Sequence, residues 1–198
     1  YKKCLSIGID LTKDMIPVVP AAHYCCGGIK VNLNGESSIR RLYALGEASS
    51  TGLHGGNRLA SNSMMEAAVY ADAAARHAIS VIDSIELQRD IPAWDYEGTA
   101  VPEEMALITQ DYKEMQQIMT NYVGIVRSDV RLERAKRRLE IIFKETEELY
   151  LKSTLSQHLC ELRNMIAVGY LIIKQAEARH ESVGLHYSID YPAKPVEI

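Results

Sequence analysis

Hydrophobic residues recur every three or four positions in three long segments of the second half of the chain. The apolar seams run over residues 105–122, 132–149 and 155–176. This spacing places apolar side chains along one face of a helix. The connections near residues 124–128 and 152–154 are short, and short connections favour antiparallel neighbours. We therefore predict an antiparallel three-helix bundle.

The first third of the chain shows a different pattern. Residues 29–33 form a short apolar run, Asn34-Gly35 is a strong signal for a two-residue turn, and a return strand is expected near residues 39–44. This pattern predicts a β hairpin. Helical spacing resumes from about Ser61 to Asp83, a segment rich in alanine. The expected order is hairpin, glycine-rich loop and helix.

These patterns predict an α+β fold that is predominantly α, with a small β-rich part and one helix preceding the bundle. We expect a first unit over residues 1–86, a linker over 87–101, the bundle over 102–182, and a tail over 183–198. Pro102, Glu103 and Glu104 suit the first turn of a helix, where proline is tolerated and carboxylates meet the positive end of the helix dipole. The tail carries enough aromatic and apolar residues to predict that it packs back on the body.

Composition excludes several classes of protein. Of the residues, 47% are hydrophobic and the net charge is −4, which is typical of a globular protein and argues against a general nucleic-acid binder. No apolar run reaches the roughly 20 residues that cross a bilayer, so no membrane association is expected. A first unit with a thin sheet leaves strand edges unpaired, and such edges allow self-association.

The four cysteines are Cys4, Cys25, Cys26 and Cys160. Their spacing suggests neither a disulfide framework nor a zinc site, and it favours a reduced, cytoplasmic compartment. Histidines 23 and 54 lie near the cysteine pair, but the spacing fits no familiar metal site, so no metal is expected.

The stretch from Tyr43 to Ala67 carries the clearest chemistry. It reads as a short apolar run, a loop with glycines at 52, 55 and 56, and a helix start preceded by Arg58. Glycines let a backbone approach a ligand closely, and helix N-termini attract anions. Arginine adds a planar fork suited to a carboxylate or phosphate. The segment is therefore a candidate anion or cofactor cradle, with an ordinary glycine-rich connection as the alternative.

Several long motifs resemble those of one flavoprotein family. They are HYCCGGI at 23–29, LYALGE at 42–47, TGLHGGNRLASNS at 51–63, and GLHYSIDYP at 184–192. Together they resemble the family of succinate dehydrogenase, fumarate reductase and L-aspartate oxidase. RLASNSMME at 58–66 and the GLHYSIDYP ending are more similar to the L-aspartate oxidase branch. Gly56 stands where alanine is usual in the family, and Val183 where arginine is expected.

The resemblance implies a site for a dicarboxylic substrate. It assigns His23 as a hydrogen-bond donor to one substrate carboxylate and Arg58 as the clamp on a carboxylate. His54, in the same loop, would help to shape the site. A histidine or arginine outside these motifs would more often be structural or exposed, so the assignment depends on the motifs.

The resemblance also implies FAD. Glu47 matches the glutamate that hydrogen-bonds the ribityl or ribose part of the flavin, and the backbones of Ser63 and Met64 would meet the isoalloxazine edge. A helix start aimed at the flavin would stabilise negative charge on its reduced form. For Ser63, helix capping is a compatible structural role.

Other parts of the family pattern are missing. No G-x-G-x-x-G fingerprint occurs in the chain, and the family's proton-transfer arginine is expected upstream, so no catalytic residue is assigned here. Residues 1–86 would then be the C-terminal segment of an FAD-binding domain, and the chain a fragment. We expect this fragment to bind FAD weakly or not at all and to be inactive alone.

The leading hypothesis is therefore that the chain is part of an FAD-dependent L-aspartate oxidase. Such an enzyme converts L-aspartate to iminoaspartate in de novo NAD (quinolinate) biosynthesis, with oxygen or fumarate as electron acceptor and a functional link to quinolinate synthase. One alternative is the flavoprotein subunit of a succinate dehydrogenase or fumarate reductase. A third, of another class, is a helical protein-interaction module.

Overall fold

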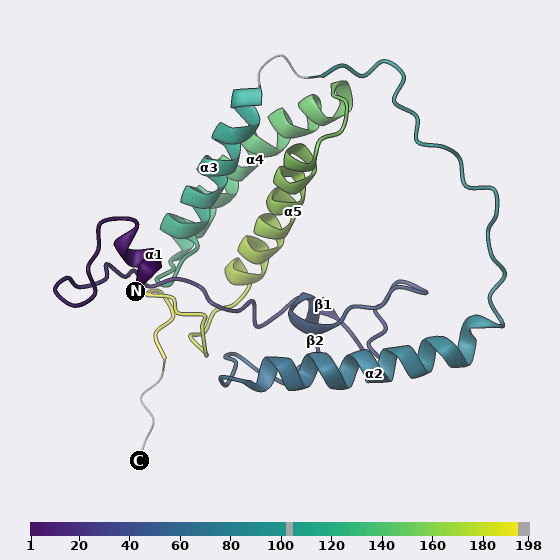
Figure 1. Ribbon diagram of the computed structural model, residues 1–198, viewed down its shortest axis with the longest axis horizontal. Helices are drawn as coiled ribbons and strands as arrows, with labels where there is room; N and C mark the ends of the chain where they lie inside the picture. The colour runs from purple at the N-terminus through teal and green to yellow at the C-terminus, as the bar shows by residue number, and fades with distance from the viewer. Residues whose placement is uncertain (102–104, 194–198) are drawn as a thin grey trace.

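The computed structural model describes residues 1–101 and 105–193. In chain order the elements are α1 (Lys2–Leu5), β1 (Ile29–Lys30), η1 (Gly46–Ala48), β2 (Ser49–Ser50), α2 (Asn62–Ile82), α3 (Met105–Tyr122), α4 (Asp129–Lys152) and α5 (Gln157–Glu177) (Figure 1). The described residues are thus mostly helical with a small two-stranded parallel sheet, an α+β arrangement. The expected first turn at Pro102, Glu103 and Glu104 lies outside the described residues.

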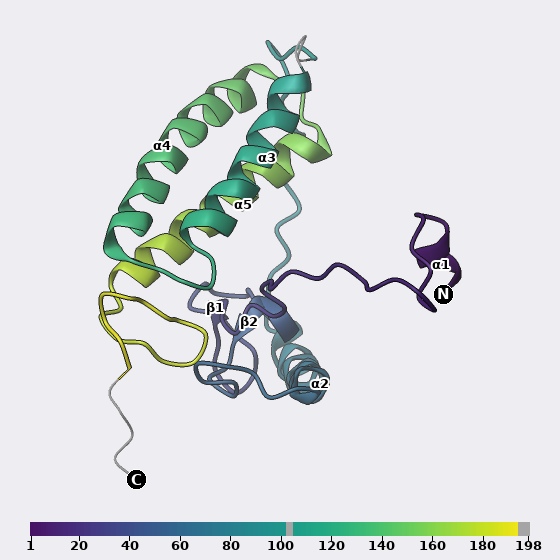
Figure 2. The same cartoon turned by 90° about the vertical axis from the view of Figure 1, so that its left-hand side faces the viewer.

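Helices α3, α4 and α5 pack on one another, and their facing side chains form the main core (Figures 1 and 2). We call these helices the three-helix unit. Its innermost side chains include Ile108, Ile118, Leu132, Leu139, Leu159, Leu162, Ile166 and Ile173. These residues belong to the apolar seams of the sequence, because helical spacing decides which side chains share a face.

Serine caps set the starts of two of these helices. The Ser128 Oγ accepts a hydrogen bond from Arg131 N at 3.3 Å at the start of α4, and the Ser156 Oγ accepts one from Leu159 N at 3.3 Å at the start of α5. Such caps satisfy backbone N–H groups that have no partner within the helix.

The predicted hairpin is wrong in its detail. Residues 29–30 pair in parallel with Ser49–Ser50, and the expected return strand at 39–44 is reduced to one antiparallel bridge between Glu36 and Tyr43. The side chain of Asn32 explains the difference, because its Oδ1 accepts hydrogen bonds from the N–H groups of Asn34 and Glu36 at 2.9 and 3.1 Å. A turn closed by a side chain competes with extension of the strand ladder.

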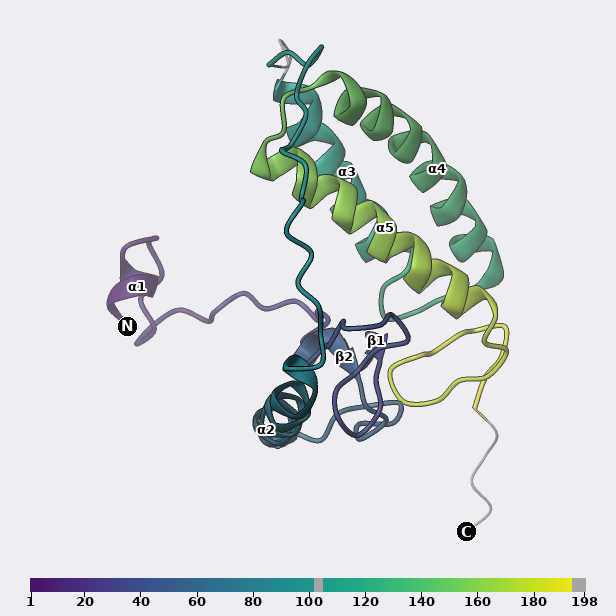
Figure 3. The same ribbon diagram turned by 90° about the vertical axis from the view of Figure 1, so that its right-hand side faces the viewer.

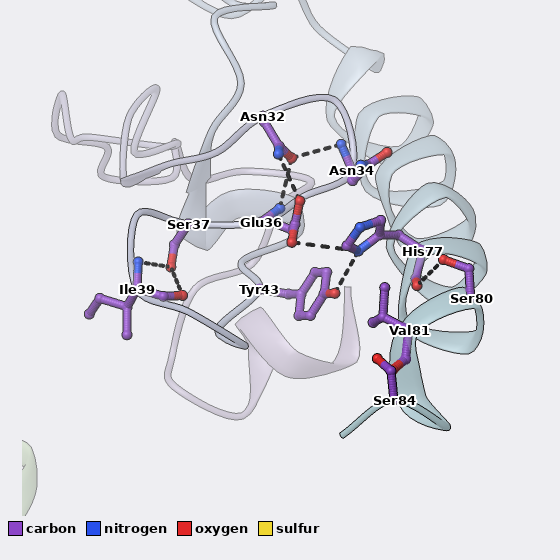
Figure 4. Close-up of polar contacts among 10 residues, drawn as sticks. All are labelled: Asn32, Asn34, Glu36, Ser37, Ile39, Tyr43, His77, Ser80, Val81 and Ser84. Carbon is purple, nitrogen blue, oxygen red and sulfur yellow. Dashed lines mark hydrogen bonds and ion pairs between the residues drawn. The ribbon is translucent and has the colours of Figure 1, made fainter. Parts of the chain in front are cut away.

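Figure 4 shows how this turn is attached to α2. Nδ1 of His77 on α2 lies 2.7 Å from the Tyr43 hydroxyl and 3.6 Å from Glu36 Oε1. Asn32 Nδ2 also donates to Glu36 Oε2 at 2.9 Å. The cluster is structural in character: it fixes residues 32–44 against the helix that follows the glycine-rich loop.

The segment after α5 returns to the rest of the molecule. Residues 183–191, which we call the strap, run between the three-helix unit and the loop that precedes α2 (Figures 2 and 3). The strap forms a parallel bridge between Ser188 and Arg127, which lies just before α4. On the loop side, Leu185 N donates to Gly56 O at 2.9 Å. One short segment therefore contacts both parts of the chain.

Two further findings concern the described residues. None of their helices is long and apolar enough to span a membrane. Their four cysteines are all free thiols.

Candidate functional site

The glycine-rich loop is anchored on a buried carboxylate. Glu66, in the second turn of α2, is 3% exposed and accepts hydrogen bonds from the Thr51 hydroxyl and from His54 Nε2, the latter at 2.7 Å. Thr51 Oγ1 in turn accepts from Leu53 N at 3.1 Å. A buried carboxylate is stable only when its oxygens are paired, so these contacts hold residues 51–54 against α2.

Arg58 lies at the end of this loop, and only some of its hydrogen-bond donors have partners. Its guanidinium stacks on Tyr24, with Cζ 4.5 Å from the ring centre, and its Nη1 donates to the Ser63 hydroxyl at 3.2 Å. Its Nε is buried and has no hydrogen-bond partner among the described residues. An unpaired guanidinium donor in a buried position costs free energy. The role of Arg58 as a carboxylate clamp stays a prediction.

Tyr24 joins the two halves of this cluster. Its ring meets the His54 ring edge-on, with centroids 5.5 Å apart, and also contacts the Arg58 guanidinium. Loss of hydration raises the pKa of Tyr24, the carboxylates of Glu66 and Glu47 raise it further, and Arg58 opposes them. The phenol is therefore neutral near pH 7 and acts as an aromatic platform and hydrogen-bond donor.

Sequence reasoning missed Tyr24, Thr51 and Glu66. Tyr24 is inside the HYCCGGI motif, directly after His23, and Glu66 ends RLASNSMME, so the motifs contained them. No spacing rule relates residue 24 to residue 58 or residue 51 to residue 66. Only the fold shows that these side chains meet.

His23 stands apart from this cluster in the present structure. It is exposed, and the described residues give it no hydrogen bond or ion pair. Its neighbour Tyr24 makes the contact with Arg58 instead. The role of His23 as a second carboxylate donor stays a prediction.

Glu47 lies in η1, close to the HYCCGGI segment. Its Oε1 accepts from Cys25 N at 3.0 Å. Gly28 allows this approach: it has φ +146°, and a Cβ on it would lie 2.3 Å from Ala48 O. The glycine thus lets the two motifs lie side by side. Glu47 is exposed, and Oε2 has no partner among the described residues, so it is free to accept from a ligand hydroxyl.

The start of α2 is the segment that the resemblance assigns to the flavin. Ser61 precedes the helix with φ +72° and makes no side-chain cap, so the first N–H groups of α2 have no capping oxygen from it. Ser63 is half-buried, and Met64 is 79% exposed. The first amide of the helix, Asn62 N, donates to Leu59 O at 3.3 Å, and the flavin contact at Ser63 and Met64 stays a prediction. Among the described residues no cluster of histidine, cysteine and carboxylate side chains could hold a metal.

Two of the departures from the family pattern, Gly56 and Val183, are neighbours in space. A Cβ added to Gly56 would lie 3.3 Å from Val183 Cγ1 and 3.3 Å from Gly184 Cα. The absence of a side chain at position 56 therefore makes room for the strap at positions 183 and 184.

Two family models match the chain. The model described as fumarate reductase flavoprotein C-term matches residues 112–195, and the model described as FAD binding domain matches residues 2–64. Curated relatives named L-aspartate oxidase include those of Vibrio cholerae, 43% identical over 100% of this chain, and Acinetobacter baylyi, 47% identical over 97%. The chain spans 37% of the length of the first and 35% of the second.

Solved structures agree with these matches. Quinol–fumarate reductase with menaquinol molecules aligns with a TM-score of 0.81 and 27% identity, over 98% of this chain and 37% of the other. Mycobacterium smegmatis Sdh1 in complex with UQ1 aligns with a TM-score of 0.78 and 26% identity, over 98% of this chain and 34% of the other. The family models and the relatives agree, and the chain belongs to the flavoprotein family of fumarate reductase and L-aspartate oxidase.

Proposed function

We propose that this chain is part of an FAD-dependent L-aspartate oxidase, which oxidises L-aspartate to iminoaspartate in NAD biosynthesis. The observation that carries the proposal is Arg58: a stacked, half-buried guanidinium with an unpaired Nε, at the end of a loop anchored on a buried carboxylate. The curated relatives named L-aspartate oxidase, at 43–47% identity, supply the reaction.

In this proposal Arg58 binds one carboxylate of the dicarboxylic substrate. The Tyr24 ring and the Ser63 hydroxyl hold the guanidinium from two directions, so little side-chain entropy remains to be lost when the substrate binds. His23 is the second donor, and it reaches the substrate from the exposed segment before Tyr24. His54 is held by Glu66 and shapes the loop without touching the reacting atoms.

Glu47, Ser63 and Met64 are the residues that would hold FAD. Glu47 has a free carboxylate oxygen for a hydroxyl, and the uncapped start of α2 offers N–H groups to a carbonyl. When bound, FAD supplies the hydride acceptor for oxidation of the substrate, and oxygen or fumarate regenerates it. The chain's own residues then bind and orient the substrate. We place the proton-transfer arginine in a part of the protein outside this chain.

The succinate dehydrogenase or fumarate reductase reading is the second candidate. Two solved fumarate reductases match with TM-scores of 0.77 and 0.81, but their identities of 26% and 27% are well below the 47% of the Acinetobacter baylyi L-aspartate oxidase. A helical interaction module is the third, and it leaves the stacked arginine and the anchored loop unexplained.

The exposed surface of α2 suggests that this chain packs against further parts of a larger protein. Met65, Val69 and Ile79 recur on one face of the helix and are 67%, 59% and 72% exposed. An exposed apolar helix face of this kind normally packs against other protein. We propose that the activity belongs to the longer flavoprotein, and that the chain alone is inactive, holds FAD weakly and self-associates through such surfaces.

Several finer assignments belong to the same proposal. We propose that the three-helix unit is an antiparallel bundle, supported by contacts between all three helix pairs and by short connections. We keep the proposed division of the chain into a first unit at 1–86, a linker at 87–101, the bundle at 102–182 and a tail at 183–198. A cytoplasmic location and a functional link to quinolinate synthase accord with free thiols and the proposed product.

The test is anaerobic reduction of the FAD-loaded complete flavoprotein that contains this chain. L-Aspartate should bleach the flavin absorbance and succinate should not. Arg58→Ala should abolish bleaching at concentrations that saturate the parent protein, because the carboxylate clamp is lost. Arg76→Ala is the matched control, since Arg76 is an exposed arginine on α2 that pairs only with Asp72 among the described residues. Bleaching by succinate alone would move the protein to the dehydrogenase branch.

A further inference from the structure

The strap contacts the glycine-rich loop at Gly56. Leu185 N donates to Gly56 O at 2.9 Å, two residues before Arg58. The two backbones are in direct contact, because a Cβ added to Gly184 would lie 2.1 Å from Gly56 O. Gly184 also has φ +59°, a conformation that favours glycine. A side chain at position 184 would force strap and loop apart.

The strap reaches this position as a closed turn. Val183 N donates to His186 O at 3.0 Å, and His186 N donates to Val183 O at 3.1 Å. These two bonds set the direction of the intervening Leu185 N–H. The contact with Gly56 therefore depends on the placement of His186, which is 8% exposed.

His186 is held by the connection between α3 and α4. The Arg127 Nη1 lies 2.9 Å from His186 Nδ1, and because a guanidinium only donates, Nδ1 is the acceptor. Arg127 is itself fixed, since its Nε donates to Val123 O and Gly124 O at 3.1 and 3.2 Å. The backbone repeats the connection: Arg127 N donates to Tyr187 O and Ile189 N donates to Arg127 O, both at 3.0 Å.

A continuous set of hydrogen bonds thus runs from the turn before α4, through Arg127 and His186, to Gly56 and the Arg58 loop. We propose that the strap is a positioning element for the dicarboxylate clamp: Arg127 and His186 hold the turn at 183–186, and the turn sets the place of Gly56 and hence of Arg58. The inference rests on the proposed function of Arg58. It makes the three-helix unit part of the substrate site without giving it any contact with substrate.

The primary test uses Gly184→Ala in the complete FAD-loaded flavoprotein that contains this chain. We expect KM for L-aspartate to rise about tenfold or more, with a smaller change in kcat and unchanged FAD content. Hydrogen exchange of the loop peptide covering residues 51–58 should become faster. Gly98→Ala is the matched control, because Gly98 also has positive φ, at +79°, but a Cβ there would meet nothing within 4 Å. It should leave KM and loop exchange unchanged.

A second pair of variants keeps the test decisive if Gly184→Ala does not fold. His186→Leu removes the acceptor for Arg127, so it should raise KM and loop exchange in the same direction. His186→Asn offers an amide oxygen near the position of Nδ1 and should restore both toward the parent values. A merely structural role would not produce this split between KM and kcat or the rescue by asparagine.

The outcomes separate the two claims. If the parent protein is not reduced by L-aspartate, the proposed function is wrong, and loop exchange in the variants still decides whether the strap holds the loop. If the parent protein turns over L-aspartate but Gly184→Ala and His186→Leu leave KM within twofold and loop exchange unchanged, the positioning role is wrong.

Discussion

The guanidinium carbon of Arg58 lies 4.5 Å from the centre of the Tyr24 ring. A cation over an aromatic face is stabilised by about 0.5–1 kcal/mol when exposed and by about 2 kcal/mol or more when desolvated. This partly buried pair connects the HYCCGGI motif with the glycine-rich loop. The two residues are distant in the sequence, and the fold brings them into contact.

Tyr24→Leu should weaken substrate binding by removing the platform under Arg58. We expect KM for L-aspartate to rise by about 3-fold to 30-fold, the equivalent of roughly 0.5–2 kcal/mol. Tyr24→Phe keeps the ring and should stay close to the parent value. Steady-state kinetics of the complete flavoprotein provide the measurement, and equal effects of the two substitutions would show that the hydroxyl matters more than the ring.

Glu66→Ala should loosen the glycine-rich loop. Thr51 and His54 would lose their buried acceptor, at a cost of about 1–3 kcal/mol. Hydrogen exchange at residues 51–58 should become faster by about 10-fold to 100-fold. Asp72→Ala is the matched control, because Asp72 is an exposed carboxylate on the same helix with only Arg76 as ion-pair partner among the described residues. Equal exchange in both variants would argue against the anchor.

The folded chain should lose stability as pH falls below about 6.5. Burial lowers the pKa of His186 and the Arg127 guanidinium lowers it further, while Arg179 contributes in both senses and Glu181 opposes. Between the unfolded value near 6.5 and the lower folded value, the unfolded chain binds more protons, so the free energy of unfolding decreases with acidity.

Urea unfolding at pH 7.5 and 5.5 measures this effect. His186→Asn cannot titrate, so its loss of stability between the two values should be smaller than that of the parent. His158→Asn is the control, because the His158 side chain is 74% exposed. A pH response in His186→Asn as large as that of the parent would assign the acid sensitivity to another group.

Leu162→Ala should strongly destabilise the three-helix unit. Leu162 is 0% exposed in the core of α5, and large-to-small substitutions at such sites cost about 2–5 kcal/mol. Leu171→Ala on the same helix is the control, since Leu171 is 57% exposed and surface changes stay within about 0.5 kcal/mol. Denaturant unfolding followed by circular dichroism at 222 nm tests the pair, and similar midpoints would contradict the assigned core.

Local patterns in the sequence determined the long helices and the place of the candidate site. Helical spacing is a property of neighbouring residues, so the seams through Leu132 and Leu162 identified core faces without knowledge of the partners. The glycine-rich loop, Arg58 and the helix after it were likewise contained in one continuous stretch. The hairpin failed because the side chain of Asn32 closed the turn, a competition that composition alone does not decide.

Only the tertiary structure decided which distant groups meet. Three contacts join residues from different segments: the Tyr24 ring with Arg58, the Glu66 carboxylate with His54, and Gly184 with Gly56. No periodicity of the sequence relates these positions. Such contacts depend on how the elements pack and on where a backbone without a side chain lets another approach. The sequence by itself therefore determined the long helices and the chemistry of the loop, and the packing of the strap and α2 decided the geometry in which Arg58 is held.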